Sequence, residues 1–124
     1  MLIDEDLTNL IIGKAIIVHS TLGPGLLESV YEACLAYEIT QDGVFIERQK
    51  TLPVRYKSII LDDGMRMDMV VDNRVIIELK CVENILPVHE AQLYTYLKLS
   101  GYKVGLLFNF YTRYLKDGMK RIVL

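Results

Sequence analysis

The fold of this chain is decided by residues 65–71, Met65-Arg66-Met67-Asp68-Met69-Val70-Val71, and by residues 74–80, Arg74-Val75-Ile76-Ile77-Glu78-Leu79-Lys80. Apolar residues occupy the odd positions of both segments, and side chains alternate between the two faces of a β-strand. For both apolar sets to share one face, facing residues must have numbers of the same parity, because a slip of one residue turns a whole set over. The pattern therefore predicts an antiparallel hairpin with Asp68 opposite Glu78 and Lys80 two residues further along the same face.

This register depends on the loop between the two strands. A loop of odd effective length, such as Asp72-Asn73-Arg74 with a bulge, keeps the parity. A strict two-residue turn at Asp72-Asn73 would instead pair Asp68 with Ile77 and separate the two carboxylates. The sequence leaves both loops open, so the proximity of Asp68 and Glu78 is a conditional prediction.

Two carboxylates on opposite residues of a sheet repel each other and destabilise it. The repulsion is relieved if a cation lies between Asp68 and Glu78, or if Lys80 neutralises one of them. Hard oxygen ligands favour Mg²⁺ or Mn²⁺, which keep several waters and take one or two protein carboxylates together with phosphate oxygens of a substrate. Alternatively, the same residues form a solvated face with a cross-strand salt bridge, and the hairpin alone does not decide between the two.

The rest of the chain predicts helices and strands around this hairpin. Apolar residues recur at helical spacing over residues 4–20 and 26–40, and Pro87 begins a third helix that continues to about residue 99. Strand formers dominate residues 45–56, 59–61, 65–71, 75–82 and 104–111, and Asp117-Gly118 is typical of a hairpin turn that joins residues 114–116 to 119–124. This order predicts an α/β fold, a mixed β-sheet flanked by α-helices, with residues 104–108 in a central strand covered on both faces.

Length and composition indicate one domain over residues 1–124. The chain has 124 residues, of which 52% are apolar and 24% charged, as in a globular domain with a substantial core. No apolar run approaches the ~20 residues that span a bilayer, and the start, Met1-Leu2-Ile3-Asp4-Glu5-Asp6, is acidic where a secretory signal is basic. We therefore expect a cytoplasmic protein without a membrane span, in which Cys34 and Cys81 are reduced.

The net charge bears on the kind of partner. It is formally −2, whereas a basic excess is usual in proteins that bind nucleic acid tightly without sequence preference. The net charge therefore disfavours a protein that binds nucleic acid tightly without sequence preference. An enzyme that acts on nucleic acid is not excluded, because carboxylates that bind a metal ion make the net charge of the chain more negative.

An ordered set of motifs resembles the PD-(D/E)XK nuclease superfamily. Asp68 is followed by Glu78-Leu79-Lys80 on the next strand and by a helix that bears Gln92 and Tyr96. Within the superfamily the chain resembles the small bacterial GxxExxY family, whose motif is present as Gly25-Leu26-Leu27-Glu28-Ser29-Val30-Tyr31. The match continues in order through the following segments: Glu47-Arg48-Gln49, Pro87-Val88-His89-Glu90-Ala91-Gln92-Leu93 and Gly105-Leu106-Leu107-Phe108-Asn109-Phe110. One departure is Met67, which stands where the superfamily name has a proline that contributes no ligand.

The resemblance implies a role for each matching residue. Asp68 and Glu78 match the metal-binding carboxylates, with the backbone carbonyl of Leu79 as a further ligand. Lys80 matches the lysine that positions the attacking water, and Glu28 matches the helical acidic residue that related nucleases bring to the metal. Gln92 matches a glutamine on the helix that follows the core strands. The implied activity is Mg²⁺- or Mn²⁺-dependent phosphodiester hydrolysis of nucleic acid, either DNA or RNA.

Two alternatives stay open at this point. A nuclease fold can serve as a catalytically silent binding or assembly module, because fold does not dictate function. Glu28 also lies in the first turn of its helix, where the helix dipole favours a carboxylate whatever its function. The carboxyl-terminal hairpin offers an edge at which the chain could form a homodimer.

Overall fold

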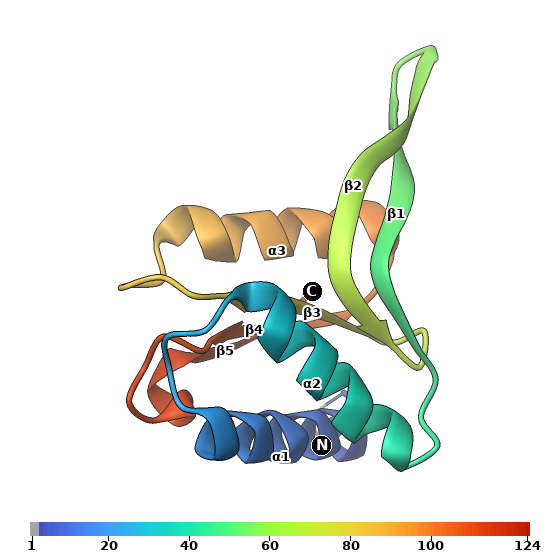
Figure 1. The fold of residues 1–124 in the computed structure, drawn as a ribbon. Helices are drawn as coiled ribbons and strands as arrows, with labels where there is room; N and C mark the ends of the chain where they lie inside the picture. The colour runs from blue at the N-terminus through green and yellow to red at the C-terminus, as the bar shows by residue number, and fades with distance from the viewer. Residues whose placement is uncertain (1–2) are drawn as a thin grey trace.

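A computed structural model describes residues 3–124 as three helices and a five-stranded sheet (Figure 1). The elements are α1 (Glu5–Leu22), α2 (Glu28–Gln41), β1 (Ile46–Tyr56), β2 (Ile59–Val71), β3 (Val75–Lys80), α3 (Pro87–Ser100), β4 (Val104–Asn109), the short 3₁₀ helix η1 (Leu115–Gly118) and β5 (Met119–Val123). The predicted α/β fold, a mixed sheet flanked by helices, is confirmed. Within residues 3–124, no helix is both long and apolar enough to cross a bilayer.

The sheet runs in the order β1-β2-β3-β4-β5, and only the central pair β3 and β4 is parallel. The crossover between these two strands contains α3, as a parallel connection requires. Helices α1 and α2 lie on one side of the sheet and α3 on the other (Figure 1). Every residue of β4 is buried, so the prediction of a central strand covered on both faces is confirmed.

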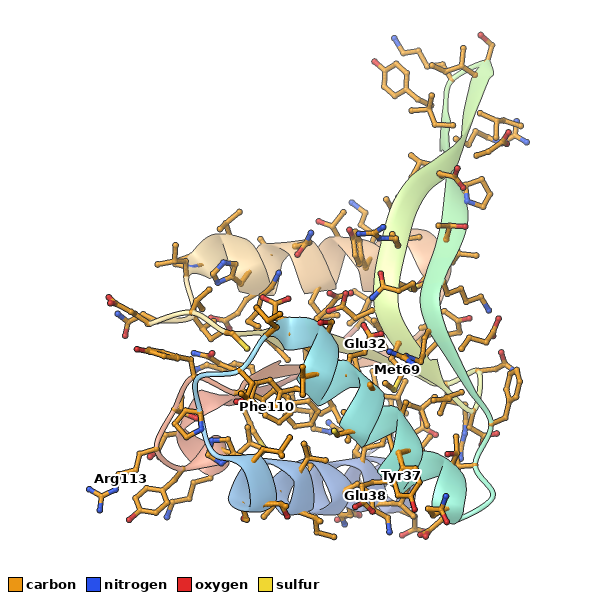
Figure 2. The ribbon with its side chains drawn as sticks, viewed as in Figure 1. Glu32, Tyr37, Glu38, Met69, Phe110 and Arg113 are labelled. Carbon is orange, nitrogen blue, oxygen red and sulfur yellow. The ribbon has the colours of Figure 1, made fainter. Side chains whose placement is uncertain are left out.

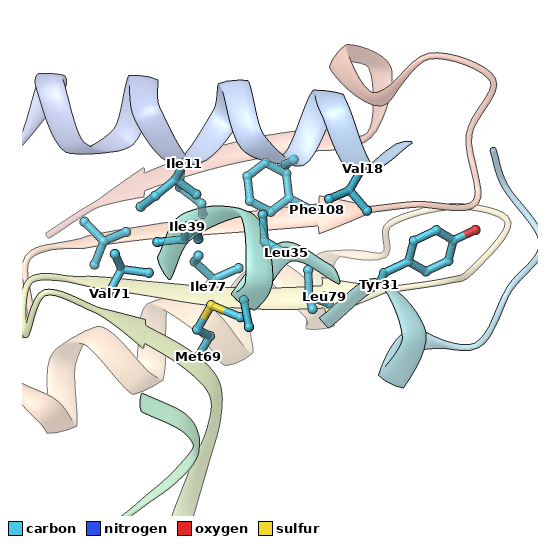
Figure 3. Close-up of a cluster of buried hydrophobic side chains, with 14 of the residues drawn as sticks. Ile11, Val18, Tyr31, Leu35, Ile39, Met69, Val71, Ile77, Leu79 and Phe108 are labelled. Carbon is cyan, nitrogen blue, oxygen red and sulfur yellow. The ribbon is translucent and has the colours of Figure 1, made fainter. Parts of the chain in front are cut away.

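Two apolar clusters fill the spaces between the sheet and the helices. The larger one joins α1 and α2 to the sheet and includes Ile11, Val18, Tyr31, Leu35, Ile39, Met69, Val71, Ile77, Leu79 and Phe108 (Figure 3). The smaller one joins α3 to the other face and comprises Met65, Met67, Val70, Ile76, Leu93, Leu97 and Leu107. Spacings of three or four residues in the helices, and alternation in β3 and β4, place these side chains on the core faces.

The β1–β2 pair twists at Asp68, so that residues of the same parity before and after it lie on opposite faces of the sheet. Met65 and Met67 pack with α3, whereas Met69 packs beneath α1 and α2. Gln49 lies opposite Asp68 and has a positive φ of 50°, a conformation that is uncommon for residues other than glycine. The prediction that all odd apolar positions share one face is therefore wrong for Met65 and Met67, because α3 supplies a second apolar surface at that end.

Two other predictions of local structure are wrong. The Asp62-Asp63-Gly64 segment does not separate two strands, because β2 continues through it with a bulge opposite Pro53. The carboxyl-terminal hairpin does not form either. Residues 115–118 make η1, whose Leu115 is buried, and β5 pairs with the free edge of β4 instead.

The far end of the β1–β2 pair projects from the rest of the molecule as an arm (Figure 1). Its strands pair through Val54 with Leu61, Arg55 with Ile60 and Tyr56 with Ile59. Residues paired directly, and residues two apart in a strand, share a face. One face of the arm is therefore wholly apolar: Val54, Tyr56, Ile59 and Leu61.

Candidate metal centre

The candidate site lies where β2 and β3 part. Their ladder consists of Met69 with Ile77, Val70 with Ile76 and Val71 with Val75. The loop has the odd length of three residues, Asp72, Asn73 and Arg74, of which the first two have positive φ. The predicted parity is confirmed, and it sets Asp68 against Glu78 immediately beyond the last ladder pair.

At this point side chains replace the backbone hydrogen bonds of the ladder. The backbone N–H of Leu79 donates to Asp68 Oδ2 at 2.9 Å, and the N–H of Asp68 donates to Glu78 Oε1 at 3.3 Å. In an extended strand the N–H and C=O of one residue point to the same side. The carbonyl of Leu79 therefore faces the same gap as its N–H, beyond the reach of the β2 ladder.

Glu78 is a buried carboxyl group without a cation to balance it. Its residue surface is only 4% exposed. Burial, followed by the charge of the neighbouring Asp68, raises the pKa of Glu78 to about 9, and the more distant charge of Lys80 offsets this only in part. The pair therefore holds a proton at neutral pH unless a positive charge enters the gap.

The donor set fits a hard divalent cation. It consists of oxygen atoms alone, from two carboxylates and one backbone carbonyl, and Mg²⁺ characteristically takes one or two protein carboxylates and fills its other positions with water or phosphate oxygens. Within residues 3–124, His, Cys, Asp and Glu side chains form no group of three or more that could hold a metal ion. A metal here would thus rest on Asp68, Glu78 and the Leu79 carbonyl.

Glu28 faces the same region from the start of α2. It lines a hollow of about 420 Å³ together with these residues: Ser29, Glu32, Gln49, Arg66, Asp68 and Leu79. Burial, with a smaller contribution from the charge of Glu28, raises the pKa of Cys81 to about 11. Glu28 thus shares a hollow with Leu79 of β3, although its own side chain is exposed.

Sequence reasoning missed Glu32 and Gln49 at this site. Glu32 is buried one turn after Glu28, and its carboxylate accepts hydrogen bonds from Arg48 Nε at 2.9 Å and from Gln49 Nε2. The same amide nitrogen lies 3.5 Å from Asp68 Oδ1. Figure 2 shows Glu32 beside β2, near Met69. The spacing from Glu28 to Glu32 was the signal that could have found Glu32.

Lys80 and Gln92 lie on the α3 side of the sheet, the face that Lys80 shares with Glu78 two residues before it in β3. They line a hollow of about 520 Å³ beside α3, whose other lining residues are Val88, His89, Ala91 and Thr95. Gln92 Nε2 donates to the hydroxyl of Tyr96 at 3.3 Å. Lys80 makes no ion pair with any residue in the described range 3–124. Its ammonium is therefore free to meet a ligand.

The three residues of the Gly25…Glu28…Tyr31 motif have separate structural roles. Gly25 has a φ of 105°, which favours glycine, and Glu28 lines the hollow described above. Tyr31 is fully buried, its hydroxyl donates to the carbonyl of Gly23 and accepts from the N–H of Leu26, and its ring stacks on Phe110. Tyr31 therefore fixes the loop that leads into α2, rather than bonding to Glu28.

A comparison with protein families agrees with this architecture. The family model described as the PD-(D/E)XK nuclease superfamily matches residues 5–122, which is nearly the whole chain. No curated protein and no solved structure matches the chain. With its family match and its mixed sheet flanked by helices, the chain belongs to the PD-(D/E)XK nuclease superfamily.

Proposed function

We propose that the protein is a divalent-metal-dependent phosphodiesterase that cuts nucleic acid, DNA or RNA, with Mg²⁺ or Mn²⁺ as its cofactor. The observation that carries the proposal is the Asp68–Glu78 pair, two carboxylates with the Leu79 carbonyl beside them and no ion pair to any cation of residues 3–124. Such a bound ion polarises a phosphate and lowers the pKa of a bound water.

The positions of the protein's own groups support a role for each of them. Asp68, Glu78 and the Leu79 carbonyl would hold the metal, and Glu28, which shares a hollow with Asp68 and Leu79, would brace the water around it. Lys80 holds the attacking water and offsets the charge that develops on the phosphate. Gln92, held by Tyr96 beside Lys80, donates to the substrate backbone.

Cleavage by matched variants tests these roles. Asp68→Asn and Glu78→Gln keep the size of each side chain, and each should remove Mg²⁺-dependent cleavage of single- and double-stranded DNA and RNA. Lys80→Met should remove cleavage but leave Mg²⁺ binding intact. Glu83→Gln, an exposed carboxylate outside both hollows, is the control and should cut as the wild type does. Cleavage that survives Glu78→Gln would contradict the proposal.

The finer assignments from the sequence are also proposals. The arrangement of Gly25, Glu28 and Tyr31 supports membership in the GxxExxY family. Cys34 and Cys81 are free thiols, which supports a cytoplasmic location because reducing compartments keep cysteines unpaired. Fractionation of cells that express the protein tests the location.

The alternative function, an assembly module, is favoured by one observation on the arm. Tyr56, Ile59 and Leu61 on its apolar face are each more than half exposed, and an isolated two-stranded hairpin is marginal in water. Arg55 and Lys57 lie toward its tip and Asp62 and Asp63 toward its base, and none of these four charges is ion-paired within residues 3–124. Two arms stacked antiparallel would join opposite charges at both ends, so we infer a two-fold homodimer formed through the arms.

A charge exchange tests the homodimer by sedimentation velocity. Asp62→Lys/Asp63→Lys and Arg55→Glu/Lys57→Glu should each give monomers, and a mixture of the two should recover a dimer. Glu5→Lys/Asp6→Lys, which changes the net charge equally on α1, should leave the dimer intact. A monomeric wild type, or a mixture that stays monomeric, would contradict the arm as the interface.

A further inference from the structure

The segment from Tyr111 to Lys116, after β4, combines aromatic and basic side chains on an exposed loop. Tyr111 is 49% exposed and Tyr114 is 54% exposed. Arg113 lies between them in sequence, and its guanidinium carbon is 5.3 Å from the centre of the Tyr114 ring. Figure 2 shows Arg113 extending away from the ribbon. The loop therefore offers flat aromatic faces and a cation to solvent.

This loop is held rigidly by buried groups. Leu115 is in the core, and the buried His19 Nε2 donates to the carbonyl of Thr112 at 2.7 Å. The side chain of Asn109 accepts from the N–H of Tyr111 at 3.1 Å. The backbone that carries the tyrosines is thus fixed before any ligand arrives, which lowers the entropic cost of binding.

The same contacts join the loop to the strand that carries the metal centre. Asn109 bonds to both the N–H and the carbonyl of Val82, two residues after Lys80. The N–H of Phe110 donates to the carbonyl of Lys80 at 2.9 Å. Tyr111 therefore lies directly beside the end of β3. This is a place where ligands are expected, because ligands of α/β sheets bind at the carboxyl ends of parallel strands.

A hollow lies between this loop and the segment that precedes α2. It measures about 350 Å³ and is lined by Pro24, Gly25, Tyr111, Thr112 and Arg113. The ring of Tyr31 stacks on that of Phe110, with ring centres 4.5 Å apart, and this contact joins the segment before α2 to the segment after β4. Glu28, which lines the hollow at Asp68, follows Gly25 by three residues, so the segment that forms one wall here continues to the candidate metal centre.

The charge of this region is opposite to that of the whole chain. Residues 111–124 contain four basic residues and one acidic residue, although the net charge of the chain is −2. Arg113, Lys116 and Lys120 form no ion pair with other residues of the described range 3–124. Uncompensated cations next to exposed aromatic rings are the combination that binds a single strand, through its phosphates and its base faces.

We propose that the Tyr111–Lys116 loop binds an unpaired nucleic-acid strand and delivers it to the metal centre. Bases stack on Tyr111 and Tyr114, and Arg113 and Lys116 neutralise the phosphates between them. Stacking needs open base faces, which a duplex hides in its interior, so the loop selects single strands, frayed ends or flaps. The inference deepens the proposed function, because it assigns the substrate class of the same site.

Binding without metal separates this inference from the proposed cleavage. The fluorescence anisotropy of a labelled 12-nucleotide single strand of mixed sequence is measured in EDTA, beside a duplex of the same sequence. The single strand should bind the wild type more tightly than the duplex does. Tyr111→Leu/Tyr114→Leu should weaken single-strand binding about tenfold or more, and Arg113→Gln/Lys116→Gln should flatten its dependence on salt.

Matched controls sharpen the outcome. Tyr37→Leu removes a still more exposed tyrosine from α2 and should bind as the wild type does, and circular dichroism checks that each variant folds. Equal binding of duplex and single strand, or unchanged binding by the Tyr111/Tyr114 variant, would overturn the inference even if metal-dependent cleavage is observed. Loss of binding in that variant supports the inference even if no cleavage is found.

Discussion

Asp68 lies where strands β2 and β3 part. Its position there explains why its carboxylate is tolerated beside that of Glu78. Its Oδ2 satisfies the Leu79 N–H that the ladder no longer reaches, and its own N–H is satisfied by Glu78. An unpaired buried N–H costs about 1–3 kcal/mol. Each carboxylate thus has a structural contact that offsets part of the repulsion between them.

The raised pKa of Glu78 makes the stability of the metal-free protein depend on pH. The unfolded chain loses this proton near the ordinary value of 4.5, whereas the folded protein keeps it up to about 9. Between these values the folded state binds more protons, so stability falls as pH rises. Urea unfolding in EDTA should give a free energy of unfolding lower by more than about 1 kcal/mol at pH 8 than at pH 5. Glu78→Gln should remove most of this difference, and an unchanged slope would contradict the assignment.

The sequence predicted the residue pair but not its neighbours. Alternating apolar positions predicted Asp68 against Glu78 on the condition of an odd loop, and the three-residue loop of the structure meets that condition. Gln49 was noted only within the Glu47-Arg48-Gln49 motif, and its place at the site could not be predicted, since it reaches the site through a positive φ in β1. Such a conformation depends on how the arm crosses the sheet, which no local pattern encodes.

At the scale of elements, the loop before α2 depends on one hydroxyl group. Tyr31→Phe keeps the stack on Phe110 but removes the bonds to the Gly23 carbonyl and the Leu26 N–H. The free energy of unfolding should fall by about 1–2 kcal/mol, and hydrogen exchange should rise at residues 23–28. An unchanged stability and exchange rate would show that the hydroxyl does not fix this loop.

The arm depends on a close approach of its two strands. A Cβ added at Gly64 would lie 2.7 Å from both Cβ and Cγ2 of Val54, too close for unchanged packing. Gly64→Ala should therefore lower the free energy of unfolding by about 1–3 kcal/mol and lower the midpoint of thermal unfolding. In a Val54→Gly background, which lacks both clashing atoms, the same change should cost less.

Gly13→Ala is the matched control for the arm. It lies within α1, where nothing is within 4 Å of the added Cβ, and it should stabilise the protein by about 0.5–1 kcal/mol. If Gly64→Ala proved as benign as Gly13→Ala, the strand pairing of the arm would be incorrect.

At the scale of the whole molecule, the order of elements followed from periodicity, because helices and strands bury faces of different period. The carboxyl-terminal hairpin failed for a reason that local sequence cannot supply. Asp117-Gly118 is a good turn signal, but β4 offers an unpaired edge to residues 119–123 and the core takes up Leu115. The pairing of β5 with β4 therefore outweighed the local preference for a hairpin turn at Asp117-Gly118.

The sheet also explains why the candidate site draws on distant parts of the chain. Asp68 and Glu78 come from an antiparallel pair, Glu28 from α2 and Lys80 with Gln92 from the α3 side. Asp68 and Leu79 line one hollow, and Lys80, the residue after Leu79, lines the other. A substrate phosphate bound at Asp68 and Glu78 would lie close to Lys80, which follows Glu78 by two residues on the same face of β3, as the proposed hydrolysis needs.

Calorimetric titration with Mg²⁺ or Mn²⁺ at pH 7, in two buffers of different ionisation enthalpy, tests the central claim most directly. The ion needs both carboxylates ionised, and the pKa of Glu78 is about 9, so binding should release about one proton for each ion bound. Glu78→Gln should abolish both the binding and the proton release. An absence of binding at millimolar metal, or binding by the wild type that Glu78→Gln leaves unchanged, would contradict a metal centre at Asp68 and Glu78.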